Sequence, residues 1–274
     1  MSNWRAAASR PSGFQRIQNV NSYLVNVPDS INSPIDDYYN HRTRVITTTT
    51  PQLLGHANWL SGLVITSMIS ATELYFREIF SRVLSFCPES QKLSAEQSIH
   101  MGAVIWHGQR IFSLAAFEHF SFAGSEKIKK CSKEFLGFEI KKTSNTIAAL
   151  EEFEKLCELR HGIVHSGSVL PGKNAVKLHA IKTNERSVIE CDVVRVHEAT
   201  AACTALVESY NAELYEEIVT RWATRWRRDP AWTNQLEHKM LKEIVEIFFS
   251  KSNPPVEQVS TIKLRNLIKN DFHI

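Results

Sequence analysis

The residues best suited to chemistry in this chain stand together in the segment Arg160-His161-Gly162-Ile163-Val164-His165. An unperturbed imidazole has a pKa of about 6.5, so histidine can accept and donate protons near neutral pH. A guanidinium stabilises the charge that develops on a phosphoryl group. These side chains suit cleavage of RNA through its 2′-hydroxyl without a metal. One imidazole would remove the 2′-OH proton, another would protonate the leaving 5′-oxygen, and the arginine would stabilise the phosphorane.

A helix must position these residues. On a helical wheel, the apolar side chains of residues 149–164 share one arc, and Arg160 falls in its middle. A guanidinium there needs a carboxylate or phosphate partner, because an unpaired charge is costly to bury. Gly162 costs roughly 1 kcal/mol relative to alanine inside a helix. We therefore expect Gly162 to mark a close approach of two backbones.

The spacing of Arg160 and His165 limits how they can act together. On one straight helix they point about 140° apart, so they do not converge on one atom within a single chain. They can converge if two copies of the helix cross at a two-fold axis and offer the same patch to each other. We therefore expect a homodimer with a composite site that contains both copies of Arg160 and two to four histidines, from His161 and His165.

The segment Arg160-His161-x-x-x-His165 resembles the arginine, polar residue and histidine motif of the HEPN superfamily. Members of that superfamily are all-helical bundles and are commonly metal-independent ribonucleases that act as dimers. With Gly167, an expected hairpin and a return helix, residues 55–222 are similar to RiboL-PSP-type and abortive-infection HEPN proteins of bacterial defence. One HEPN subset carries a tyrosine, a target for nucleotide addition, two residues after the histidine; here that position is Gly167, so the resemblance does not imply that regulation.

The resemblance implies a function and a site. Arg160 and His165 would be the catalytic pair, His161 the polar second residue, and Glu73 the supporting acid from an earlier helix. The implied activity is that of an endoribonuclease in a toxin or antiviral defence system. The implied partners are RNA, with tRNA as one candidate, a second copy of the chain, and an antitoxin or sensor protein.

The role of Glu73 has two interpretations. It lies on a long helix expected from about His56 to Phe86, on one face with Ser70 and Arg77. It either meets Arg160 across the bundle and fixes its rotamer, or pairs with Arg77 one turn along the same helix.

Other functions also fit the motif. His161 and His165 have the spacing of two metal ligands on one helix face, and Glu154 or Glu158 can add an oxygen ligand. A zinc protease is not indicated, because Gly162 stands where its helix motif needs glutamate, and we predict no metal and no cofactor. The bundle can instead be a non-catalytic module that dimerises and binds a partner or RNA, with Arg160 in a structural ion pair. In the plainest alternative both histidines are core residues.

Composition indicates a cytoplasmic protein with a substantial core. The chain has 274 residues, 43% of them hydrophobic, and a net charge of +3, so any basic surface must be local. Its five cysteines form no CxxC pair and no signal peptide is evident, which predicts reduced thiols. The apolar run from Leu60 to Phe80 is interrupted by polar and charged residues, so we expect no membrane span.

We predict a mainly α protein, a HEPN-like helical bundle with a small β-hairpin insertion. Residues 1–52 are expected to be an extended arm, in which Tyr38 and Tyr39 either touch a partner or lie on the chain's own domain. Residues 53–228 are expected to be the bundle, with the hairpin at about 176–191, and residues 229–274 a C-terminal helical appendage. Within the bundle, helices are expected from Ser94 to about His119, from about Thr143, and from about Asp192 to Arg228.

The last of these helices ends in a group of basic and aromatic residues. Tryptophans there can dock the helix while arginine stems cover them. Arginine beside aromatic faces also suits bases and phosphates, which makes the group a candidate for binding RNA. The RNA-binding candidates are Arg221, Arg225, Trp226 and Arg228.

Overall fold

The computed structural model describes residues 13, 16–57, 59–108, 112–254 and 259–274. The described residues fall into two units, which separate between Ile31 and Asn32. The described residues of the first unit include a 3-10 helix, η2 (Val20–Tyr23), which has no buried residue. The second unit carries the core and the candidate site.

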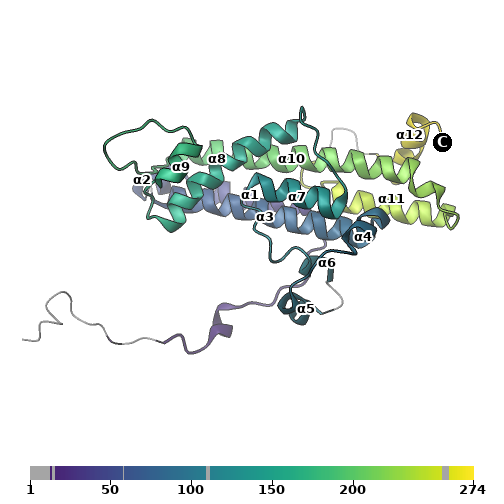
Figure 1. Cartoon of the computed structure of the whole chain (residues 1–274), viewed down its shortest axis with the longest axis horizontal. Helices are drawn as coiled ribbons and strands as arrows, with labels where there is room; N and C mark the ends of the chain where they lie inside the picture. Colours follow the sequence, from purple (N-terminus) through teal and green to yellow (C-terminus); the bar gives the residue numbers. More distant parts are fainter. Residues whose placement is uncertain (1–12, 14–15, 58, 109–111, 255–258) are drawn as a thin grey trace, which may run out of the picture. The chain divides into compact units, whose positions relative to one another are not determined.

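The second unit is helical throughout its regular structure (Figure 1). Its described residues contain no β-strand, so the prediction of a mainly α protein is confirmed. The elements are α1 (Pro34–Thr48), α2 (Pro51–His56), α3 (Trp59–Phe86), α4 (Pro88–Ser94), α5 (Met101–His107), α6 (Phe112–Ala115), α7 (Ser125–Leu136), α8 (Asn145–His165), α9 (Gly172–Lys177), α10 (Val193–Thr224), the 3-10 turn η4 (Trp226–Arg228), α11 (Asn234–Phe248) and α12 (Thr261–Asp271).

The three longest helices, α3, α8 and α10, pack side by side around one core (Figure 1). Aromatic rings join α3 to α10: the centroid of the Tyr210 ring lies 4.9 Å from that of Phe76 and 6.0 Å from that of Phe80, in edge-on contacts. All three side chains are fully buried. Such edge-on pairs stabilise a core beyond the area that they bury, and they fix the two helices on which the site depends.

Capping residues set the starts of the helices. The Ser144 hydroxyl accepts a hydrogen bond from the Ile147 N–H at the start of α8, and Asp192 accepts one from the Arg195 N–H at the start of α10. These side chains satisfy amide groups that have no partner inside the helix. The predicted starts of both helices are therefore confirmed. The single helix predicted from Ser94 to His119 is wrong, because Gly108, at φ +65°, ends α5 there.

Residues 34–48 form α1 and are not extended. Ser33 caps this helix and Pro34 occupies its first turn, where proline is favourable. Tyr38 and Tyr39 are buried, and the Tyr39 hydroxyl donates a hydrogen bond to the Glu208 carboxylate on α10 at 2.6 Å. Burial and the neighbouring Glu208 raise the pKa of Tyr39 to about 12. This part of the predicted arm lies on the chain's own bundle.

The C-terminal residues also contribute to the core. Leu241 and Ile244 of α11 are fully buried in the hydrophobic cluster that includes α3 and α10. The side chain of Asn211 on α10 donates a hydrogen bond to the Phe248 carbonyl at the end of α11, at 2.9 Å. The segment predicted as a C-terminal appendage therefore packs directly on the central helices.

The predicted β-hairpin at residues 176–191 is wrong. Its first half is the end of α9 and a turn, and its second half meets residues 168–170 through one antiparallel bridge between Val169 and Val188. The physical reason is the anchoring of α9. Asn174 and Lys177, three residues apart, share a face of a helix but would lie on opposite faces of a strand. On the helix α9 both side chains reach Glu158 of α8.

Candidate functional site at the end of α8

Gly162 lies where the end of α8 meets two other segments. A Cβ atom at this position would lie 2.5 Å from Ile189 Cδ1 and 3.1 Å from the Val169 carbonyl oxygen. On α3, a Cβ at Gly62 would lie 3.1 Å from Ile163 Cγ2. The expected close approach at Gly162 is confirmed. The two glycines hold α8 against α3 and against the segment that follows it.

His161 and His165 are exposed on successive turns at this end of α8. Their imidazole rings are tilted by 52°, with centroids 4.9 Å apart. Neither ring forms a hydrogen bond or ion pair with another part of the described chain. The two imidazoles are therefore adjacent and accessible, as proton transfer to or from a bound substrate requires.

Arg160 is half-buried, on the side of α8 that carries the apolar arc. Its Nε atom is buried without a hydrogen-bond partner, and within the described residues its guanidinium forms no ion pair. A buried donor without a partner costs about 1–3 kcal/mol, more when the group is charged. The unsatisfied Nε is therefore the group in this site that most needs a hydrogen-bond acceptor from outside the chain.

Glu73 of α3 is engaged by other groups. Its carboxylate accepts hydrogen bonds from the Arg77 guanidinium at 3.4 Å, the Ser121 hydroxyl at 3.3 Å and the Phe122 N–H at 3.0 Å. The structure thus contains the Glu73–Arg77 pair that the sequence allowed as the alternative. Among the described residues Glu73 makes no contact with Arg160 that would fix its rotamer.

Two residues that the sequence analysis did not single out hold α9 on α8. Asn174 donates a hydrogen bond to the Glu158 carboxylate at 2.5 Å and another to the Glu158 carbonyl at 3.3 Å. Lys177 forms an ion pair with the same carboxylate. The signal in the sequence was Pro171-Gly172 followed by polar residues three apart, which is typical of a short helix with one polar face.

The two glutamates that the metal alternative needs have other partners. Glu158 is bound by Asn174 and Lys177, and Glu154 accepts a hydrogen bond from the Ser125 N–H at 2.7 Å, which caps α7. In the described part of the chain no group of three or more histidine, cysteine or acidic side chains has a geometry that could hold a metal ion.

The cysteines are all free, four of them buried. Burial raises the pKa of Cys131 and Cys203 to about 12, and it also raises the pKa of Cys157, one turn before Arg160. These three thiols therefore stay protonated at neutral pH and are poor nucleophiles.

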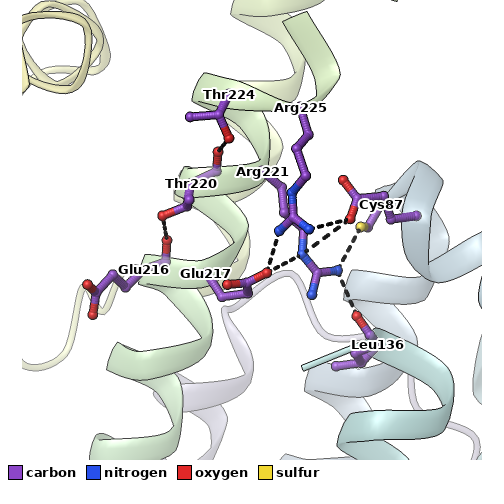
Figure 2. Close-up of polar contacts among 9 residues, drawn as sticks. Cys87, Leu136, Glu216, Glu217, Thr220, Arg221, Thr224 and Arg225 are labelled. Atoms are coloured by element: carbon purple, nitrogen blue, oxygen red, sulfur yellow. Dashed lines mark hydrogen bonds and ion pairs between the residues drawn. The ribbon is translucent and has the colours of Figure 1, made fainter. Parts of the chain in front are cut away.

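Arg221, an RNA-binding candidate, lies inside the molecule, only 1% exposed. Figure 2 shows its guanidinium directed towards Cys87 and Leu136. Its guanidinium donates hydrogen bonds to the Glu217 carboxylate at 2.8 Å and to the Leu136 carbonyl at 2.6 Å, and it lies 3.8 Å from Cys87 Sγ. Burial alone would lower the pKa of Arg221, but the Glu217 carboxylate raises it, so the group stays charged. This arginine joins α10 to α7 and to the start of α4.

The other three candidates differ in exposure. Trp226 is buried, with its ring edge-on to Phe86, which is the docking role that the sequence allowed. Arg225 is exposed but pairs with Glu217 and Glu89. Arg228 is exposed and has no ion pair within the described residues, so it is the member of this group best placed to meet a phosphate.

Comparisons of the chain with family models, curated proteins and solved structures give no match. None of the described helices is both long enough and apolar enough to span a membrane.

Proposed function

We propose that this protein is a metal-independent endoribonuclease of HEPN type, with Arg160, His161 and His165 as its catalytic residues. One observation carries the proposal. Two accessible imidazoles, with centroids 4.9 Å apart, lie on the same helix end as a guanidinium whose buried Nε has no partner. RNA cleavage through the 2′-hydroxyl needs a proton acceptor, a proton donor and a cation for the phosphorane, which are the groups present.

The reaction proposed is an in-line transfer within the RNA. One imidazole takes the 2′-OH proton as the 2′-oxygen bonds to phosphorus. The bond from phosphorus to the 5′-oxygen breaks, and a second, protonated imidazole gives its proton to that oxygen. The products are a 2′,3′-cyclic phosphate and a 5′-hydroxyl, and Arg160 binds the non-bridging oxygens throughout.

The proposed site is completed by a second copy of the chain. Arg160 lies on the apolar side of α8 and His165 on its exposed side, so one chain does not direct both at one phosphate. Apolar side chains are exposed next to the contact between Gly62 and Ile163: Trp59 is 68%, Leu63 51% and Val164 45% exposed. Exposed apolar patches are typical of interfaces, which supports a two-fold contact here.

The setting of the proposal comes from the family resemblance. A HEPN ribonuclease of this type would act in the cytoplasm as a toxin or antiviral defence effector, with RNA as substrate and tRNA as one candidate. An antitoxin or sensor protein would hold it inactive until needed.

Cleavage of total RNA and of tRNA in EDTA tests the proposal. We would compare the wild type with Arg160→Ala, His161→Ala and His165→Ala, and use His238→Ala, an exposed histidine on α11, as the matched control. The expected result is cleavage by the wild type and the control, with 2′,3′-cyclic phosphate ends, its loss in Arg160→Ala and His165→Ala, and a strong reduction in His161→Ala. Circular dichroism and light scattering would check that the variants stay folded and keep their oligomeric state.

Each other outcome overturns the proposal. Cleavage by His165→Ala at the wild-type rate would refute the site, and cleavage lost on chelation would favour a metal at His161 and His165. No cleavage by folded, dimeric wild type would favour the alternative, a non-catalytic module that binds a partner or RNA. The Glu73–Arg77 pair leaves Arg160 without support from Glu73, which suits that alternative, but the structural ion pair that it expects for Arg160 is absent from the described residues.

A further inference from the structure

The segment from Gly172 to Ser187, which we call the basic loop, carries the net charge of the whole chain. It contains four basic residues, Lys173, Lys177, Lys182 and Arg186, and one acidic residue, Glu185. The complete sequence has 32 basic and 29 acidic residues, so the remainder has equal numbers of each. The chain outside this segment is neutral as a whole, although it contains other basic runs, such as the four arginines of residues 221–228.

The basic loop is fixed to the bundle at both ends. At its start, α9 is held on α8 by the contacts of Asn174 and Lys177 with Glu158. At its end, the Leu170 N–H donates to the Ser187 carbonyl at 2.9 Å, beside the bridge between Val169 and Val188. The loop therefore keeps its place relative to α8.

The anchor places α9, the start of the basic loop, at Glu158, on the helix face that carries the histidines. Glu158, His161 and His165 are three and seven residues apart in α8, so they share one face of the helix. Lys177 neutralises Glu158, whereas Lys173, Lys182 and Arg186 are exposed and form no ion pair within the described chain. Three cations without an acidic partner thus belong to a segment whose first helix, α9, is anchored on the helix that carries both imidazoles.

We propose that the basic loop is the RNA-binding surface of this protein, and that it holds the phosphate backbone while a phosphodiester reaches His161 and His165. This inference rests on the proposed function for the role of the histidines. The loop contains no phenylalanine, tyrosine or tryptophan on which bases could stack. Recognition is therefore through phosphates, independent of sequence and strongly dependent on salt.

Binding of a fluorescein-labelled single-stranded RNA, followed by anisotropy at several salt concentrations, tests the inference. The full chain with His165→Ala would be used so that the RNA stays intact. On this background the loop variant is Lys173→Gln, Lys182→Gln and Arg186→Gln; Lys177 stays, because it anchors α9. The matched control is Lys129→Gln, Lys141→Gln and Lys142→Gln, three lysines that are also exposed but lie on α7 and before α8.

The loop variant is expected to bind at least about tenfold more weakly at low salt, and its plot of log affinity against log salt to be shallower by about 2. The control is expected to bind as the His165→Ala parent does. A control that loses as much affinity as the loop variant, or a loop variant that binds like the parent, would overturn the inference. Binding of phosphatidylserine vesicles in place of RNA, lost in the loop variant, would overturn it in favour of a membrane surface.

Cleavage by the corresponding proteins with His165 intact separates this inference from the proposed function. If the wild type binds RNA through the basic loop but does not cleave it, the RNA-binding surface is supported and the ribonuclease activity is refuted. If the loop substitutions change neither RNA binding nor RNA cleavage, the basic loop is not the RNA-binding surface, but the proposed ribonuclease activity is not refuted. Absence of RNA binding by every protein at low salt refutes both.

Discussion

Asn174 of α9 donates a hydrogen bond to the carboxylate of Glu158 on α8, with Nδ2 and Oε2 2.5 Å apart. The amide is buried, and its second bond, to the Glu158 carbonyl, fixes its orientation. Hydrogen bonds to an ionised group in a buried place are among the stronger ones in proteins. This contact fixes the position of α9, the first helix after α8, on the helix that carries the histidines.

Replacing Asn174 by leucine should release α9 from α8. The variant loses two hydrogen bonds to Glu158 and keeps only the ion pair with Lys177, so we expect a loss of about 1–3 kcal/mol in the free energy of unfolding. Amide hydrogen exchange in residues 172–177 should accelerate more than exchange in α10. Lys173→Ala, on the exposed side of the same helix, is the control and should change neither quantity. Unchanged exchange in α9 would show that the contact does not anchor it.

Gly162→Ala should destabilise the protein although alanine is the better helix former. The added Cβ would lie 2.5 Å from Ile189 Cδ1 and 3.1 Å from the Val169 carbonyl, so the segment after α8 must move. Overpacking of this kind costs about 1–3 kcal/mol, more than the gain of roughly 1 kcal/mol in helix propensity. Urea denaturation would measure the difference.

Two further variants make the Gly162 prediction specific. Gly102→Ala on α5 has nothing within 4 Å of its new Cβ and should be neutral or stabilising. Ile189→Ala removes the nearest atom, so adding it to Gly162→Ala should restore part of the stability that Gly162→Ala loses. Additive losses in the double variant would mean that the two side chains do not meet.

The long helices and their starts could be predicted from the sequence because their signals are local. Ser144 and Asp192 are capping residues directly before apolar periodic runs, and each caps its helix in the structure. The close backbone approach at Gly162 could also be predicted, because a glycine inside an apolar helical arc has few other physical explanations.

The contacts of the site could not be predicted because they depend on partners far away in the sequence. Periodicity placed Glu73 and Arg77 on one face but could not show that Ser121 and the Phe122 N–H would also reach the carboxylate. The alternation of residues 176–182 favoured a strand. The contacts of Asn174 and Lys177 with α8 instead favour a helix as far as Lys177, and residues 178–182 continue as a turn and irregular chain; only the tertiary structure shows these contacts.

Arg221→Met should destabilise the bundle and leave the RNA affinity of the folded protein unchanged. The variant removes a donor from the buried Leu136 carbonyl, and we expect a loss of about 2–3 kcal/mol in urea denaturation. Glu217 and Glu89 retain their ion pairs with Arg225, so the substitution leaves neither carboxylate unpaired. Arg225→Met is the control: its side chain is 46% exposed, and exposed pairs contribute about 0–1 kcal/mol. Weaker RNA binding by folded Arg221→Met would restore this residue as a candidate contact.

Asp36→Asn should lower stability at neutral pH, by an amount that shrinks in acid. Burial alone would raise the pKa of Asp36, but hydrogen bonds from the Ser250 hydroxyl and the N–H groups of Lys251 and Ser252 outweigh it and lower the pKa below 3.8. A carboxylate whose pKa is lowered by folding stabilises the folded state fully at any pH above its pKa in the unfolded chain. This contribution is lost as the pH falls through its pKa in the folded state.

Urea denaturation of the wild type and Asp36→Asn, from about pH 7 down to about pH 3, would test this prediction. The difference in unfolding free energy should be constant near neutrality and decrease below pH 3.8, the ordinary value of the aspartate. Asp37→Asn is the control, because Asp37 binds Asn32 and not the turn at residues 250–252, and it should cost less at neutral pH. A difference between wild type and Asp36→Asn that stays constant in acid would mean that the contacts of α1 with this turn do not depend on the charge of Asp36.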